Sequence, residues 1–265
     1  IFYSLDYGQT WSIYFFGDTV TLAQKGDKAL LQGNNPNGFS IGYDSNAASP
    51  EKYIHFVILD SIAASGSVMS LIDSTGRKDT VPSKWCFYGL FADCDKLTQA
   101  PELPATTLTN CCYKEMFRGC TGLTQAPELP ATTLAVRCYQ EMFRGCSGLT
   151  QAPALPATTL TDYCYQGMFQ ECTDLTQAPE LSATVVADYC CQGMFQDCSS
   201  LTQAPSLPAI ALAPSCYSGM FYNCTSLTKA PELPATTLAY YCYAGMFNGC
   251  TNLTPGPELP PTQQG

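Results

Sequence analysis

The stretch MFRGCTGLTQAPELPATTL, from Met116 to Leu134, returns 26 residues later as MFRGCSGLTQAPALPATTL, from Met142 to Leu160. Cysteine, leucine and phenylalanine keep this step along most of the chain. One cysteine series is Cys94, Cys120, Cys146, Cys172, Cys198, Cys224 and Cys250. The other is Cys86, Cys112, Cys138, Cys164, Cys190, Cys216 and Cys242. Seven copies in register predict an architecture of stacked repeats.

Each copy divides into a helical part and an extended part. In TDYCYQGMFQEC, from Thr161 to Cys172, apolar residues at positions i, i+1, i+4 and i+5 predict a short helix, which Thr161 or Asp162 would cap. The residue before the cysteine is expected to end the helix in a left-handed turn, a place that suits glycine and asparagine. That residue is Gly119, Gly145, Asn223 or Gly249, and less suitably Glu171 or Asp197.

The motif LTQAP predicts a short strand after each helix. Leu123 and Ala126 would point inward and Gln125 outward, and Pro127 would end the pairing because it has no N–H. Pro127 and Pro130 favour an extended return. We therefore expect an α/β repeat over residues 83–265: a right-handed, leucine-rich-repeat-like solenoid of about seven repeats, each with a short strand, an extended return and a short helix.

Residues 1–82 do not repeat and predict an all-β region that is capping or sandwich-like. YSLDYGQTWSIYFF indicates two strands around a Tyr-Gly turn, and DTVTLAQKGDKALLQG two more around KGD. A solenoid needs its first repeat covered, although the region could instead be a separate binding module. Tyr7 and Trp11 could form a carbohydrate platform, but we favour aromatic core, and we interpret His55 as a structural histidine.

The pattern MFxGC(T/S)xL resembles the BspA-like leucine-rich repeats of bacterial surface proteins, whose core reads AFxxCxxL. Met116, Phe117, Cys120 and Leu123 match that core position by position, and the resemblance covers about Trp85 to Pro260. The added APELPATTL resembles the longer Cys- and Pro-rich variant of gut anaerobes. The resemblance implies a protein that is exported, on the cell surface or secreted, and non-enzymatic, with a role in adhesion to host or matrix proteins.

The cysteines allow several interpretations. Cys112 and Cys120 would lie about 12 Å apart along a helix, too far for a disulfide. Their spacing is not that of a zinc knuckle, and the single histidine, His55, lies outside the repeats. We favour buried free thiols over disulfides and over metal or catalytic sites. Cys111, which breaks the series, is predicted to be the most exposed thiol.

Composition narrows the classes of function. A net charge of −10 on 265 residues lacks the basic surface of a nucleic-acid-binding protein and argues against docking on anionic membranes. No apolar run approaches the roughly 20 residues that span a bilayer, so no membrane insertion is expected. No nucleophile–base pair, metal-ligand spacing or phosphate loop is present, so we expect no enzyme, cofactor or metal.

Positions that are identical in all copies are explained by packing, so a ligand must be recognised by outward positions. One candidate row lies on the strand side: Gln125, Gln151, Gln177, Gln203 and Lys229. A second row precedes the helix cysteine: Tyr163, Tyr189 and Tyr241. A charged group is interpreted as ordinary soluble surface: Lys114, Glu115, Arg118, Glu141 and Arg144.

We therefore predict a monomeric cell-surface binding or adhesion protein that recognises a host or matrix protein through its solenoid. The alternatives are a glycan-binding surface protein and a structural spacer with no ligand of its own.

Overall fold

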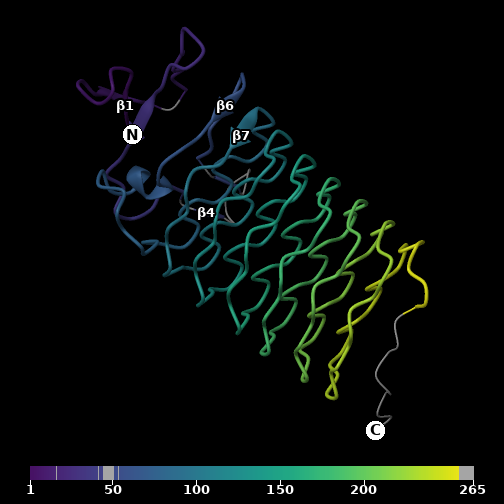
Figure 1. Ribbon diagram of the computed structural model, residues 1–265. Helices are drawn as coiled ribbons and strands as arrows, with labels where there is room; N and C mark the ends of the chain where they lie inside the picture. Colours follow the sequence, from purple (N-terminus) through teal and green to yellow (C-terminus); the bar gives the residue numbers. More distant parts are fainter. Residues whose placement is uncertain (16, 41, 44–50, 53, 257–265) are drawn as a thin grey trace.

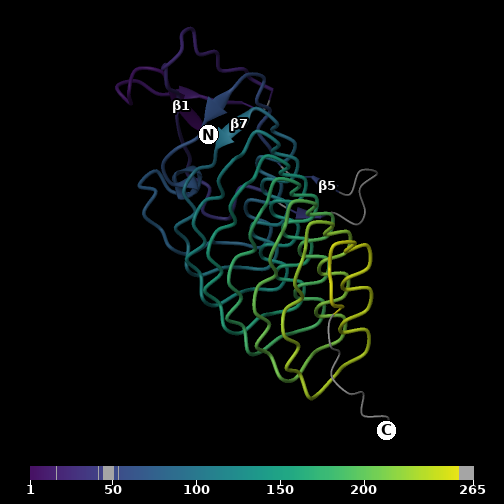
Figure 2. The ribbon, with the colours of Figure 1, turned by 45° about the vertical axis from the view of Figure 1, so that its right-hand side comes forward.

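The structure, a computed structural model, describes residues 1–15, 17–40, 42–43, 51–52 and 54–256. It is a coil of stacked copies with an N-terminal unit at one end (Figure 1), and a second view shows each copy as one turn of the coil (Figure 2). Its strands are short: β1 (Phe2–Ser4), β2 (Ser12–Ile13), β3 (Leu30–Gln32), β4 (Gly42–Tyr43), β5 (Glu51–Lys52), β6 (Ile62–Ala63) and β7 (Leu97–Gln99). In the described part of the chain the only helix is the 3₁₀ helix η1 (Val68–Leu71).

The segment predicted as a helix in each copy is instead a run of consecutive β-turns, so the helix prediction is wrong. Every second N–H donates to the carbonyl three residues earlier, as from Met116 to Tyr113 at 3.2 Å. The N–H groups in between donate to the next copy, as from Phe117 to Met142 at 2.9 Å. An α-helix would bond each N–H four residues back. Bonds between copies therefore replace half of the local bonds.

A positive φ recurs at every fourth residue of these turns. In one copy the residues are Tyr163 (φ 58°), Gly167 (58°) and Glu171 (62°). A type II turn requires positive φ at its third residue, a place that glycine or asparagine usually takes. The predicted left-handed turn before each cysteine is confirmed. It also occurs at Glu171 and at Asp197 (61°), although their side chains make it less favourable.

The predicted strand forms as a strand only in the first copy, where β7 pairs in parallel with β6. In later copies the pairing narrows to single parallel bridges, such as Gln125 with Gln151. Leu123 is buried, Ala126 partly buried and Gln125 exposed, as predicted. Pro127 has no N–H to donate, so the ladder does not continue through it.

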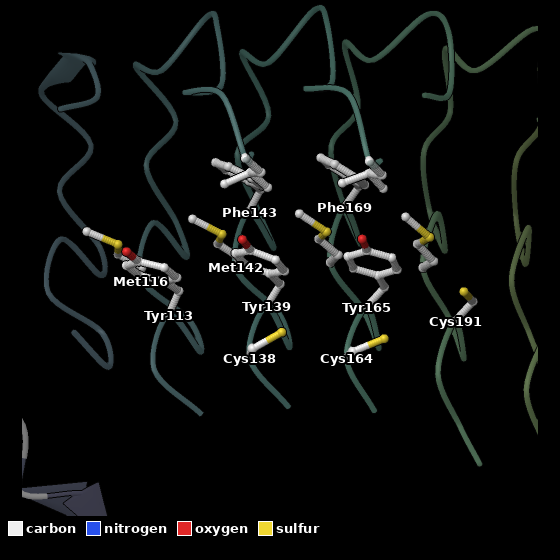
Figure 3. Packing of buried hydrophobic residues seen from close by; sticks show 14 of the residues in the cluster. Tyr113, Met116, Cys138, Tyr139, Met142, Phe143, Cys164, Tyr165, Phe169 and Cys191 are labelled. Atoms are coloured by element: carbon white, nitrogen blue, oxygen red, sulfur yellow. The ribbon is translucent and has the colours of Figure 1, made fainter. Parts of the chain in front are cut away.

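Identical side chains stack from copy to copy inside the coil. The ring of Phe143 lies 5.6 Å from that of Phe117 and 5.6 Å from that of Phe169, with planes within 5°. A second stack joins the tyrosines four residues earlier, including Tyr139, and Cys191 interrupts it (Figure 3). Because each ring repeats in the same orientation, one copy buries its apolar side mainly against the next.

The N-terminal unit contains the predicted hairpin. β1 pairs antiparallel with β2 and with β3, and the turn after β1 has positive φ at Tyr7 (60°) and Gly8 (86°). The Asp6 carboxylate accepts hydrogen bonds from the Thr10 backbone N–H (2.9 Å) and the Thr10 hydroxyl (2.6 Å), which hold the turn closed. The strand predicted before KGD, around residues 20–22, does not form.

Residues 54–81 bond to the first copy much as later copies bond to one another. The Phe56 N–H donates to Leu90 (2.8 Å), Val68 to Glu102 (3.0 Å) and Val81 to Thr107 (3.0 Å). Hydrogen bonding between successive turns of the coil therefore begins upstream of residue 82. The predicted division of the chain into residues 1–82 and 83–265 stays a prediction.

Candidate binding surfaces

The two cysteine series line the inside of the coil. All sixteen cysteines are free, and all are buried except Cys250, which is half-buried. In one series the S–H donates to a phenylalanine carbonyl of the preceding copy, as from Cys146 to Phe117 (3.0 Å) and from Cys172 to Phe143 (3.1 Å). The thiols thus pack as small side chains that also donate a weak hydrogen bond. The prediction of buried free thiols is confirmed.

The prediction that Cys111 is the most exposed thiol is wrong. Its exposed fraction is 5%. The residues at the same place in the adjacent copies are Trp85 and Arg137. Both have larger side chains than Cys111, which is why a cysteine between them is shielded from solvent. Burial raises the pKa of the Cys111 thiol, and the positive charges of Lys114 and Arg137 lower it to a lesser extent. Within the described residues, no group of three or more His, Cys, Asp or Glu is arranged to hold a metal ion.

In the native protein at neutral pH, we expect a thiol reagent to label at most Cys250. The thiolate is the reactive species, and burial raises the pKa of Cys94 to about 11 and of Cys86 to about 12. After denaturation without a reductant, the same reagent should label most of the sixteen cysteines. Intact-mass spectrometry counts the labels, and labelling of only a few cysteines in the denatured chain would reveal disulfides and contradict the interpretation.

The structure stacks two of the predicted tyrosines against each other. The rings of Tyr163 and Tyr189 lie 4.8 Å apart with planes within 3°. The guanidinium of Arg137, one copy earlier, lies 4.3 Å from the ring centre of Tyr163, over its other face. We call Arg137, Tyr163 and Tyr189 the tyrosine stack. It lies on the outer side of the turns, which we call the turn face.

Tyr241 does not join the tyrosine stack. Ser215 occupies the row between Tyr189 and Tyr241. Tyr241 is 58% exposed, and its ring centre lies 3.9 Å from that of Tyr240. The predicted row is therefore a stack of two tyrosines and one separate tyrosine pair.

The row of Gln125, Gln151, Gln177, Gln203 and Lys229 is a ladder of parallel bridges with exposed side chains. It comes from the extended part of each copy, whereas the tyrosines come from the turns. Among the described residues no recorded hydrogen bond or ring contact joins the two rows. They are two separate surfaces.

The charged residues of the first two copies form ion pairs on the turn face. Arg118 pairs with Asp93 (2.9 Å) and with Glu115 (3.7 Å). Arg144 pairs with Glu141 (3.1 Å) and, one copy further, with an exposed glutamate at position 171 (3.3 Å). Glu115 is buried, with an exposed fraction of 8%, and the other four predicted charged residues are half-buried. The interpretation as ordinary soluble surface is therefore wrong for Glu115, whose carboxylate is held by ion pairs under partial cover.

The aromatic residues of the N-terminal hairpin are not core, which corrects the sequence interpretation. Tyr7 is 75% exposed and Trp11 is 37% exposed. The hairpin is only two to three strands wide, so no second layer covers these side chains. His55 is exposed and has an interaction partner.

A polar groove on the turn face was missed by the sequence analysis. Its volume is about 250 Å³, its floor is formed by Gly167, Gly193 and Gly219, and glutamines stand on both sides. We call it the glutamine groove. The signal for it was the glycine in the middle of the predicted helix, where Glu115 and Glu141 stand in earlier copies. Glycine is a poor helix former.

Comparison of this chain with protein-family models, with curated proteins and with solved structures finds no match. None of the described residues belongs to a helix with the length and hydrophobicity needed to cross a bilayer.

Proposed function

We propose that this protein is a non-enzymatic, surface-exposed binding or adhesion protein that recognises a partner protein through the turn face of its coil. The finer proposal is a leucine-rich-repeat-like solenoid of the BspA-like kind, exported to the cell surface or secreted. The repeat itself and the sequence resemblance support these statements. Repeat proteins commonly use an extended, uniform face for binding.

The tyrosine stack is the single observation that carries the proposal. Tyr and Arg dominate the residues that contribute most to protein–protein binding. Stacking already holds Arg137, Tyr163 and Tyr189 in place, so less side-chain entropy is lost when a partner binds. Tyr163 and Tyr189 are half-buried, so part of each side chain stays accessible to a partner.

Replacing Tyr189 with Ala should weaken binding of a host matrix protein by about 30-fold, which corresponds to the roughly 2 kcal/mol of a strong interface residue. The measurement is binding of the whole reduced chain to an array of matrix proteins, followed by titration of each protein that binds. Gln151→Ala is the matched control, because Gln151 is exposed in the other predicted row and should leave the affinity unchanged.

A loss confined to Gln151→Ala would move the site to the glutamine and lysine row. Equal affinity for wild type and both variants would contradict the proposal for the turn face. No binding to any matrix protein would favour the structural spacer.

A further inference from the structure

We propose that the glutamine groove binds a neutral, linear polysaccharide that runs along the axis of the coil. This site is separate from the tyrosine stack, and its ligand belongs to a different class from the partner protein proposed above.

The floor of the glutamine groove is open at two of its three glycines, whereas a Cβ atom added at Gly167 would lie 3.1 Å from Cγ of Glu141. A Cβ atom added at Gly219 would meet no other atom within 4 Å, and one at Gly193 would meet only the side chain of Gln196. In the preceding copies Glu115 and Glu141 fill this place. Four successive copies have glycine at this place, and the first three of them, Gly167, Gly193 and Gly219, line the groove.

The backbone N–H and carbonyl groups of the floor glycines already have hydrogen-bond partners within the protein. The N–H groups of Gly167 and Gly193 donate to the next copy, at 2.9 Å each, and their carbonyls accept from Gln170 and Gln196, at 3.1 Å each. A peptide strand that extends a sheet needs free main-chain donors and acceptors. The ligand must therefore be recognised by side chains.

The sides of the groove are amides held in position. Gln166 donates from Nε2 to Oε1 of Gln192 at 2.6 Å. On the opposite side Gln170 donates to Glu171 (3.2 Å) and Gln196 to Asp197 (3.1 Å). Each amide has two N–H donors and an oxygen with two lone pairs, so each retains donors or acceptors for a ligand. Sugar hydroxyls, which both donate and accept, match such a surface.

Gln140, which lies one copy before Gln166 in the same row, has a side-chain oxygen that accepts no hydrogen bond. Gln140 donates from Nε2 to Gln166, and its side chain is buried, with a 9% exposed fraction. Its Oε1 is buried and accepts no hydrogen bond. Gln140 is not part of the groove lining, so this buried oxygen lies outside the site.

The lining is close to neutral, which selects the charge of the ligand. Glu141 is the one ionisable residue in the lining, and Arg144 neutralises it at 3.1 Å. An acidic polysaccharide would find no unpaired cation there, and a basic ligand no unpaired anion. A neutral polymer fits without burying an unpaired charge.

The period of the walls suits a polymer. Successive copies repeat with the same orientation, because the ring of Phe195 lies 5.7 Å from that of Phe169 and 5.7 Å from that of Phe221, with planes within 5°. Two neighbouring copies therefore offer the same pair of amides, Gln166 with Gln170 and Gln192 with Gln196, and the third copy offers the Ser218 hydroxyl. Polar groups thus recur along the axis of the coil.

The test fills the groove without changing its backbone. Gly193→Gln places a neutral side chain on the floor at a φ of 59°, a value that Glu115 (55°) and Glu141 (53°) adopt in equivalent turns. Gly245→Gln is the matched control, because Gly245 has a φ of 63° in the same turn of the last copy and does not line the groove. Both variants are compared with wild type by thermal unfolding before binding is measured.

Binding is measured by affinity electrophoresis and calorimetry with neutral polysaccharides, namely xyloglucan, galactomannan and mixed-linkage β-glucan, and with polygalacturonate as the charged comparison. We expect one or more neutral polymers to bind, and Gly193→Gln to weaken that binding at least about tenfold while Gly245→Gln leaves it unchanged. A Gln192→Ala variant, which removes one amide without filling the floor, should also weaken it.

Three outcomes would overturn the proposal: no binding of any neutral polymer, binding of polygalacturonate alone, or equal loss in Gly193→Gln and Gly245→Gln. The matrix-protein assay with Tyr189→Ala is independent of all three. If the groove binds no polysaccharide, the proposal of protein recognition is therefore unaffected and is decided by the matrix-protein assay.

Discussion

Raising the pH from about 8 to about 10 in the presence of a non-thiol reductant is expected to unfold this protein. The pKa of fourteen of the sixteen thiols lies above the ordinary 9.0. Burial is the largest cause except at Cys191, where a hydrogen bond with Cys190 comes first. Burial raises the pKa of Cys94 to about 11 and that of Cys146 to about 12.

The direction in which the free energy of unfolding changes with pH depends on whether the folded or the unfolded chain holds more protons. Below pH 9 the thiols are protonated in both the folded and the unfolded chain, so they add no pH dependence. Above pH 9 the unfolded chain releases these protons while the folded chain keeps them, so the free energy of unfolding falls as pH rises. One pH unit above 9, each buried thiol lowers it by about 1.4 kcal/mol. For ten such thiols the summed loss in the free energy of unfolding is as large as the whole stability of a typical domain, about 5–15 kcal/mol.

The measurement is the free energy of unfolding by urea at several pH values between about 8 and 10. Its slope against pH counts the protons that unfolding releases. The double variant Cys146→Ala/Cys172→Ala should reduce the slope by about 2.7 kcal/mol per pH unit, since two buried thiols are removed. Cys250→Ala, at the half-buried end of the series, should reduce it less. A slope that does not change when the thiols are removed would contradict this account of the core.

Phe169→Ala is expected to cost about 3–5 kcal/mol of stability. The Phe169 side chain is fully buried, and its ring lies between those of Phe143 (5.6 Å) and Phe195 (5.7 Å). Truncation leaves a cavity in the middle of the coil and removes two stacked pairs, each of which adds about 0.5–1.5 kcal/mol beyond area burial. Urea unfolding at neutral pH under reducing conditions measures the loss.

Phe247→Ala is the matched control, because it is the same substitution at the same place in the last copy. Phe247 is half-buried, and among the described residues its ring stacks on that of Phe221 alone (5.6 Å). It should lose well under half as much stability as Phe169→Ala. Equal losses at the two positions would mean that the stacking of copies does not carry the stability.

The repeat and its core were predictable because every copy buries the same side chains. Phe143, Cys146 and Leu149 recur with a step of 26 residues, and all three are fully buried. The burial of the thiols followed from the same reasoning, since no base or metal partner accompanied them. The exposed Gln125 also lies where the sequence placed it.

The tyrosine row was predictable only in part. Its members share one place in the copy, so the sequence aligned them, but it did not show that Tyr163 and Tyr189 stack or that Arg137 covers Tyr163. Ring orientation depends on neighbouring copies rather than on the local segment. Cys111 was misjudged for the same reason, because the neighbouring side chains that cover it lie 26 residues away in each direction.

The sequence by itself determined the period, the register of the copies and the residues that face the core, because these depend only on which side chains recur. The tertiary structure decided the conformation between them. Apolar residues at i, i+1, i+4 and i+5 fit both a helix and a ribbon of turns with a repeat of four, and one short segment cannot separate the two. What separates them is the partner of every second N–H, such as that of Phe117, which lies 25 residues along the chain at Met142. The glutamine groove also depends on the tertiary structure, because the stacking of the turns sets Gly167, Gly193 and Gly219 side by side in its floor.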